Sequence, residues 1–250
     1  RLKLTDWING MWENLPPAQR ARYPLRPPEW TQRLERRHAT LPEVLRRTGY
    51  RTAHIGKWHL SPRSDDAAVL SKHYPKSHGF EVNIAGNQWG APGSYYWPYR
   101  RGKRKNEIGA RVENFPDAME TRNRYLTDML TDQAVGLIEK WTDSPFFLHI
   151  AHYAVHTPIQ AKADKIAKYE AKAKKLGLDQ VQTSTEGEHF PCEHKKDQRV
   201  KRRLVQSDPI YAAMIESLDE NLGRLFGLFD EIGESENTIV VFTSDNGGLA

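Results

Sequence analysis

The 250-residue sequence lacks the features that define several classes of protein. It holds a single cysteine, Cys192, which excludes a disulfide framework and a zinc site built on paired cysteines. No apolar run approaches the roughly 18 residues that a membrane-spanning helix needs, so these residues contain no membrane span.

The residues that are abundant indicate a folded, basic protein. Hydrophobic residues make up 38% of the chain and aromatic residues 10%, which argues against a wholly disordered chain. The formal net charge of +5 favours anionic partners such as nucleic acid, acidic lipid, or a sulfated or phosphorylated substrate. Charge alone does not choose among these partners.

Hydrophobic periodicity predicts helices that alternate with strands. Thr40 and Glu43 have the spacing of a capping box at the start of a short helix. The strands are apolar throughout, which is typical of a parallel sheet that is buried on both faces. We therefore predict an α/β fold with a mostly parallel sheet and helices on both faces. The predicted strands are 50–55, 146–151 and 238–243, and the longer predicted helices are 125–141, 159–176 and 209–232.

Two stretches, 61–123 and 177–207, are predicted to be long loop excursions. The first contains the aromatic segment 87–99, which would either pack on the sheet or stack on sugar rings. Two basic runs, 100–105 and 195–203, are interpreted first as solvated surface and second as a surface for a polyanionic substrate. Nucleic acid is disfavoured because no nucleic-acid fold motif accompanies them. The cluster of His189, Cys192 and His194 is interpreted as no metal site, since a fourth ligand at standard spacing is missing.

Polar side chains follow each predicted strand, and ligands of parallel sheets bind beyond the carboxyl ends of the strands. Lys57 and His59 follow the first strand, and His152 and His156 follow the second. A cation beside an imidazole suits an anionic group whose leaving oxygen needs a proton. Taken singly, Lys57 and His59 are better explained as an exposed lysine beside a structural histidine. His152 and His156 could each be a ligand, a base or a partly buried structural residue.

Asp245 and Asn246 follow the third predicted strand. Their oxygens are hard donors that suit calcium or magnesium, although the segment is also good turn chemistry. Two ligands are too few, because calcium takes roughly six to eight.

Taken together, these segments resemble the type I sulfatases of the alkaline phosphatase-like superfamily. The strongest match is TLPEVLRRTGYRTAHIGKWHL at 40–60, followed by FFLHIAHYAVHTP at 146–158 and TIVVFTSDNGG at 238–248. The matching segments occur in the family's order over nearly the whole chain. The resemblance implies that residues 1–250 are the central part of a single sulfatase catalytic domain with an alkaline phosphatase-like core, incomplete at both ends.

The resemblance also implies roles for individual residues. Lys57 and His59 would contact the sulfate and the leaving oxygen, and His156 would be a further histidine at the sulfate that could protonate the leaving group. Asp245 and Asn246 would be two of the Ca²⁺ ligands. The family's nucleophile is a formylglycine made from Cys or Ser in a Cys/Ser-x-Pro-x-Arg motif.

The sequence departs from the family in lacking that motif, the paired aspartates that precede it and a later lysine. We interpret this as truncation at both ends, and expect these 250 residues alone to be inactive. The predicted function of the whole protein is hydrolysis of a sulfate ester on a carbohydrate, with a sulfated small molecule or polysaccharide as the substrate. The alternatives are a phosphomonoesterase or phosphodiesterase of the same superfamily, and a non-catalytic polyanion-binding module. The resemblance implies a periplasmic or secreted location, and the oligomeric state is left open.

Overall fold

The fold was analysed in a computed structural model, which describes residues 16–21, 31, 33–62, 64–100, 110–113, 115, 124–190, 195 and 197–247. Most of residues 1–37, all but Arg100 of the run 100–105, and both Cys192 and His194 lie outside the described residues. In the part of the chain that is described, no helix has the length and apolar character to cross a membrane.

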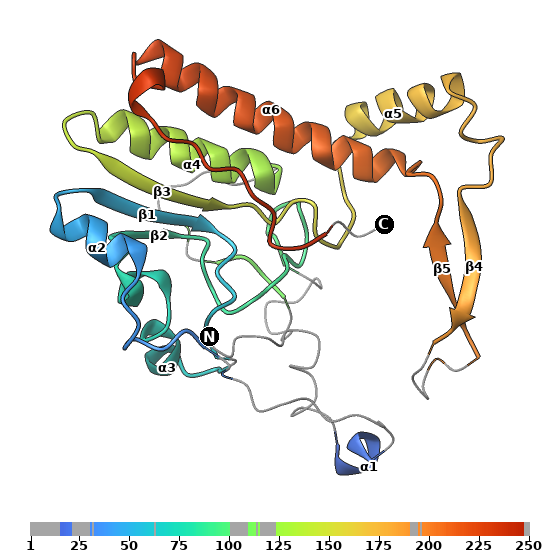
Figure 1. Cartoon of the computed structure of the whole chain (residues 1–250), viewed down its shortest axis with the longest axis horizontal. Coiled ribbons are helices and arrows are strands. Elements are labelled where there is room, and N and C mark those ends of the chain that lie inside the picture. The colour runs from blue at the N-terminus through green and yellow to red at the C-terminus, as the bar shows by residue number, and fades with distance from the viewer. Residues whose placement is uncertain are drawn as a thin grey trace.

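A parallel sheet of three strands forms the centre of the molecule (Figure 1). Strand β1 (Arg51–Gly56) lies between β2 (Val82–Ile84) and β3 (Phe146–Ala151), and both neighbours run parallel to it. Gly56 pairs with Ala151, so the carboxyl ends of β1 and β3 are level with each other. The predicted α/β class with a parallel sheet is confirmed, and the two strands predicted at 50–55 and 146–151 are found within one residue of their expected bounds.

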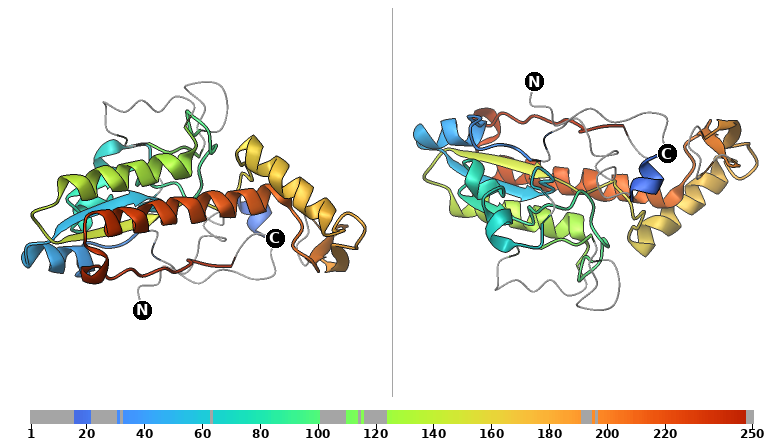
Figure 2. Two further views of the ribbon diagram at one scale, coloured as in Figure 1. Left: turned by 90° about the horizontal axis from the view of Figure 1, so that it is seen from above. Right: turned by 90° about the horizontal axis from the view of Figure 1, so that it is seen from below.

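Two long helices, α4 (Leu126–Lys140) and α6 (Pro209–Glu231), cover one face of this sheet (Figures 1 and 2). Their apolar sides meet Ile55 of β1, and together they form the larger hydrophobic core. Alternate side chains of a strand point to opposite faces, so Thr52 and His54 of β1 face the other way. That second face is covered by a smaller cluster built on Leu34, Trp58 and Phe80.

The helix starts follow local sequence signals. Helix α2 (Leu41–Arg47) begins with the predicted capping box: the Thr40 hydroxyl accepts from Glu43 N, and Thr40 N donates to the Glu43 carboxylate at 3.0 Å. Asp208 caps α6 in the same way, by accepting from the backbone N–H groups of Ile210 and Tyr211. The remaining short elements are α1 (Pro17–Arg20), α3 (Ala67–Ser71) and two 3₁₀ turns, η2 (Pro75–His78) and η4 (Ser235–Asn237).

A separate projection extends beyond the carboxyl ends of β1 and β3. It consists of helix α5 (Ala163–Lys175) and an antiparallel hairpin of β4 (Ser184–His189) and β5 (Arg199–Arg203). In Figures 1 and 2 this projection stands away from the sheet. Of its three elements, α5 is the one that packs along α6.

The prediction of a third strand at 238–243 is wrong. The segment is irregular and its apolar side chains face solvent, with Ile239 92% and Val241 81% exposed. A β-branched sequence forms a strand only where another strand accepts its hydrogen bonds. Among the described residues, β3 pairs with β1 alone and leaves its outer edge without a partner strand. The sequence also gave no sign of β2, which lies within the stretch 61–123.

Two buried histidines make the stability of the fold dependent on acid. Burial and the neighbouring His149 lower the pKa of His54 to about 3, and burial lowers the pKa of His152 to about 4, from the usual 6.5. Below pH 6.5 these two histidines therefore bind protons in the unfolded chain but not in the folded chain. The stability that they contribute is fully present above about pH 6.5. It is lost as the pH falls toward 4, when the free energy of unfolding decreases by about 1.4 kcal/mol per pH unit for each histidine.

Urea unfolding between pH 4 and 8 measures this dependence. Both ring nitrogens of His152 are buried without a partner among the described residues. The variant His152→Leu removes one of the two titrating groups, so the slope of the unfolding free energy against pH should decrease by the equivalent of about one proton. A free energy of unfolding that stays constant from pH 6.5 to 4 would contradict the account.

Candidate active site at the carboxyl ends of the strands

Lys57 leaves the end of β1 in a fixed position. Its backbone N donates to Ala151 O at 2.7 Å, which continues the ladder between β1 and β3 by one residue. Its side chain is 20% exposed, and Nζ donates to Asp245 Oδ2 at 3.2 Å. The next side chain, Trp58, is buried and donates through Nε1 to His73 O. The buried indole therefore anchors the segment that carries Lys57.

His59 is held by its backbone and by a close contact with a glycine. Its φ of 54° lies in the left-handed region, and its N donates to Asn87 O at 3.1 Å. Asn87 is fully buried, where its amide donates to Arg111 O and accepts from Trp89 N. The imidazole of His59 lies against Gly90. The contact is so close that a Cβ at Gly90 would stand 2.4 Å from two ring atoms.

The variant Gly90→Ala should therefore displace the imidazole of His59. A side-chain ring can shift at little cost to folding, so we expect a change in unfolding free energy of less than about 1 kcal/mol. If His59 acts on the substrate, kcat should fall by roughly tenfold or more, because small misplacements of reacting groups are costly. Gly223→Ala in α6 is the control, since a Cβ there meets nothing within 4 Å. Unchanged kcat in Gly90→Ala would remove His59 from the reaction.

His156 lies in a turn that begins where β3 ends. Its backbone N donates to Tyr153 O at 2.8 Å, and its own carbonyl accepts from Tyr95 Oη at 3.0 Å. The single proton of this hydroxyl is shared with the nearer Tyr153 O at 2.7 Å, so the fully buried Tyr95 holds both ends of the turn. His156 Nδ1 lies 2.9 Å from Thr157 O. We assign the ring proton to Nδ1 on this contact, which leaves the Nε2 lone pair as a proton acceptor.

The aromatic segment is thus explained in part by packing. Tyr95 and Tyr99 are fully buried, whereas Tyr96 and Trp97 are 38% and 44% exposed. Sequence reasoning missed Asn87, Gly90 and Tyr95 as residues that position the site. Their roles depend on contacts with backbone atoms remote in sequence, and nothing local in the sequence marks such contacts.

Asp245 and Asn246 lie at the end of the extended segment that follows α6. The ion pair between Asp245 and Lys57 brings this segment to the end of β1, across 188 positions of sequence. Asn246 donates through Nδ2 to Gly247 O, which leaves its carboxamide oxygen as a donor atom for a cation. The two residues have the oxygen chemistry that calcium prefers. They do not complete a site, because the described residues contain no group of three or more potential metal ligands.

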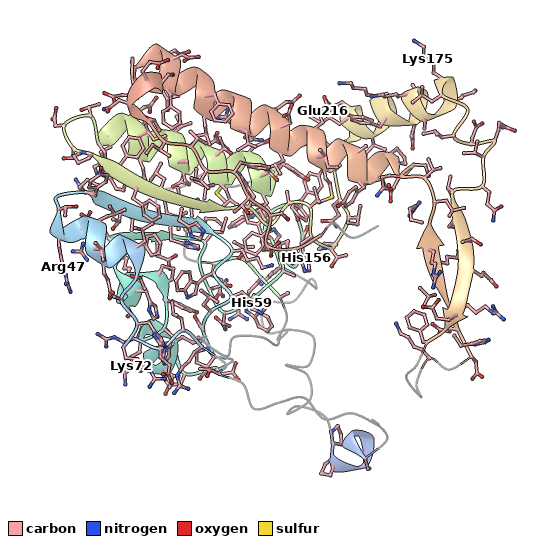
Figure 3. The ribbon with its side chains drawn as sticks, viewed as in Figure 1. Arg47, His59, Lys72, His156, Lys175 and Glu216 are labelled. Atoms are coloured by element: carbon pink, nitrogen blue, oxygen red, sulfur yellow. The ribbon has the colours of Figure 1, made fainter. Side chains whose placement is uncertain are left out.

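The predicted residues therefore gather at one edge of the sheet. Lys57 and Asp245 are in direct contact, and His59 and His156 follow neighbouring parallel strands whose ends are paired. Figure 3 shows His59 and His156 on the same side of the molecule, with Arg47 at the opposite end of the sheet. His152, the first histidine after β3, has both ring nitrogens buried and is held neutral, since burial lowers its pKa.

A hollow of about 480 Å³ lies elsewhere, between α4, α6 and the aromatic segment. Its charged walls are paired with one another, since Asp132 binds Arg124 and Arg224, and Asp128 binds Lys162. The sheet edge is the candidate active site, because its cation, imidazoles and carboxylate come from three separate segments.

Fold and site together define an α/β protein with a cationic and imidazole-bearing site at the carboxyl ends of parallel strands, an arrangement suited to an anionic ligand. The model of the Sulfatase family matches residues 8–250, nearly the whole chain. The chain belongs to this family.

Curated relatives resemble the chain at low identity. It is 27% identical over 216 residues to the uncharacterised sulfatase YdeN of Escherichia coli. The aligned region covers 84% of this chain and 33% of YdeN. It is 28% identical over 218 residues to N-acetylgalactosamine-6-sulfatase of Mus musculus, with 83% of this chain and 32% of the relative covered. The chain thus spans about a third of the length of these relatives.

Solved structures share the fold. The structure of Ps i-CgsB matches with a TM-score of 0.51 and 20% identity, over 82% of this chain and 39% of that one. The structure of yidJ from Bacteroides fragilis matches with a TM-score of 0.52 and 17% identity, over 82% of this chain and 43% of that one. These likenesses support the α/β architecture described above.

Proposed function

We propose that the full-length protein is a calcium-dependent sulfatase that hydrolyses a sulfate ester on a carbohydrate. The observation that carries the proposal is the convergence of Lys57, His59 and His156 with Asp245 at one edge of the sheet, in a chain of the Sulfatase family. The name of the mouse relative, N-acetylgalactosamine-6-sulfatase, supports a sulfated sugar as the class of substrate. We further propose that the protein is periplasmic or secreted.

The residues at the carboxyl ends of the strands would have different roles in the reaction, according to their chemistry. The Lys57 ammonium neutralises charge on the sulfuryl oxygens, which lowers the cost of bringing an electron-rich nucleophile to an anion. His59 and His156 lie where they can contact the ester, and a protonated imidazole there can donate to the departing sugar oxygen. The formylglycine that would attack sulfur lies outside these residues in this proposal.

Asp245 and Asn246 would form part of the calcium site in the full-length protein. When bound, the ion supplies further positive charge beside the sulfuryl oxygens.

Removal of calcium is expected to abolish hydrolysis of an aryl sulfate by the full-length protein. A chelator should reduce the rate of 4-nitrophenol release from 4-nitrophenyl sulfate to background, and added Ca²⁺ should restore it. Asp245→Asn should raise the calcium concentration needed for half-maximal activity by roughly tenfold or more, because one anionic ligand becomes neutral. Full activity after exhaustive chelation would refute the calcium part of the proposal.

A further inference from the structure

The projection of α5, β4 and β5 is here called the basic arm. Ile166 and Tyr169 pack α5 against the larger core, whereas the hairpin of β4 and β5 is not explained by such packing. A two-stranded hairpin is marginally stable by itself in water. Among the described residues of β4 and β5, none belongs to either hydrophobic core cluster. Four of the five residues of β5 are cations, and all four are exposed: Arg199, Lys201, Arg202 and Arg203. Exposed cations concentrated on one strand form a surface that attracts an anionic partner.

The arm is joined to the body through one side of α5. The buried Lys165 binds Glu216 at 3.1 Å and also binds Glu220, and Lys168 binds Glu216 at 2.8 Å. These lysines hold the pKa of Glu216 at about 2, so the joint stays charged at all physiological pH values. Lys174 lies about 180° around the helix from Lys165 and therefore faces away from α6. Figure 3 shows Lys175 at the outer end of α5.

The cations of the hairpin are sorted by face. Arg199, Lys201 and Arg203 alternate along β5 and thus share one face, at a spacing of about 6.6 Å. Glu186 is the carboxylate of β4 on that face, opposite Lys201, and it lies 3.9 Å from Arg199 Nε. No described carboxylate forms an ion pair with Lys201 or Arg203. On the other face, by contrast, Arg202 is neutralised by Glu188.

Position and chemistry together indicate the ligand. The arm stands beyond the carboxyl ends of β1 and β3, at the end of the sheet where His156 lies (Figures 1 and 3). A row of evenly spaced cations fits a chain that carries anionic groups at intervals. Binding of single-stranded nucleic acid would also call for exposed aromatic platforms. Among the described residues of the hairpin and its turn, Phe190 is the one Phe, Tyr or Trp, and the Lys195 ammonium lies over its ring.

We propose that the face of the basic arm formed by Arg199, Lys201 and Arg203 binds sulfate groups of a polysaccharide at positions beyond the ester that is cleaved. This inference rests on the proposed function, and it adds that the substrate is a sulfated polymer. The arm contributes binding energy that a small aryl sulfate cannot use. Polymer binding should therefore depend on the arm, whereas hydrolysis of the small substrate should not.

The test uses the full-length protein with the double variant Lys201→Glu/Arg203→Glu. The probes are dextran sulfate, unsulfated dextran, duplex DNA and 4-nitrophenyl sulfate. We expect the affinity for dextran sulfate to fall by roughly tenfold or more at low salt, with a shallower salt dependence, because two ionic contacts are lost. The neutral variant Lys201→Gln/Arg203→Gln should show a smaller loss. For 4-nitrophenyl sulfate, kcat/KM should stay unchanged.

The matched control is Arg47→Glu/Lys140→Glu, which changes the net charge equally. Both residues are exposed and end helices that precede β1 and β3, at the opposite edge of the sheet. If the control loses as much affinity as the arm variant, or the arm variant loses none, the proposal is overturned. Duplex DNA bound as tightly as dextran sulfate at the same salt would also overturn it. A protein that fails to cleave 4-nitrophenyl sulfate would refute the proposed function instead, whatever the arm binds.

Discussion

Lys57→Ala is expected to lower kcat/KM of the full-length protein for 4-nitrophenyl sulfate by roughly 10²–10³-fold. The value is that for removing one group that stabilises charge in a transition state. Folding should be little affected, because the carboxylate that loses its partner, Asp245, is 67% exposed and can be solvated. Stopped assays of product release at several substrate concentrations separate kcat from KM.

His156→Ala is expected to cause a loss of roughly 10²–10⁴-fold, the range for removal of a general acid or base. The decisive detail is the dependence on the leaving group. If His156 protonates the departing oxygen, the loss should be larger for an alkyl or sugar sulfate than for 4-nitrophenyl sulfate, whose leaving group needs no proton. Lys140→Ala, at the far edge of the sheet, is the control for both variants. Full activity in either Lys57→Ala or His156→Ala would remove that residue from the site.

Gly56→Ala is expected to have the largest effect on folding. Gly56 ends β1 with a φ of 104°, and a Cβ there would stand 2.0 Å from Ala151 O of the neighbouring strand. The Cα that would carry this Cβ and the Ala151 carbonyl both belong to paired backbone, so neither can move without breaking the ladder between β1 and β3. We expect a loss of more than about 3 kcal/mol in unfolding free energy, or failure to accumulate as soluble protein.

Gly136→Ala is the matched control for that variant. Gly136 lies on the exposed side of α4, and a Cβ there meets nothing within 4 Å. Because alanine favours a helix over glycine, this variant should gain about 0.5–1 kcal/mol. Urea unfolding measures both variants. Equal stability of Gly56→Ala and the wild type would show that β1 and β3 do not approach each other as described.

The signals that the sequence carries well are local. The capping box of Thr40 and Glu43 sets the start of α2, and the apolar spacing of α4 and α6 sets the face that they bury. The apolar run 146–151 is a strand with the predicted bounds. Since parallel strands place their carboxyl ends together, the position of Lys57, His59 and His156 at one edge could also be predicted.

Other features depend on partners remote in sequence. The segment 238–243 has the composition of a buried strand, yet its structure depends on another strand beside it. The contact between Gly90 and His59 and the hydrogen bonds of Tyr95 to the turn after β3 join separate parts of the fold. A single sequence states the preference of each segment but not the neighbour that it meets.

The most direct test of the proposed function is the ratio of kcat/KM for 4-nitrophenyl sulfate to that for 4-nitrophenyl phosphate, measured with the full-length protein. The two substrates share a leaving group and differ in the charge and chemistry of the transferred group. The proposal predicts that the sulfate is the better substrate and that the preference depends on Lys57. A clear preference for the phosphate would contradict it and assign the site to a phosphoesterase of the same architecture.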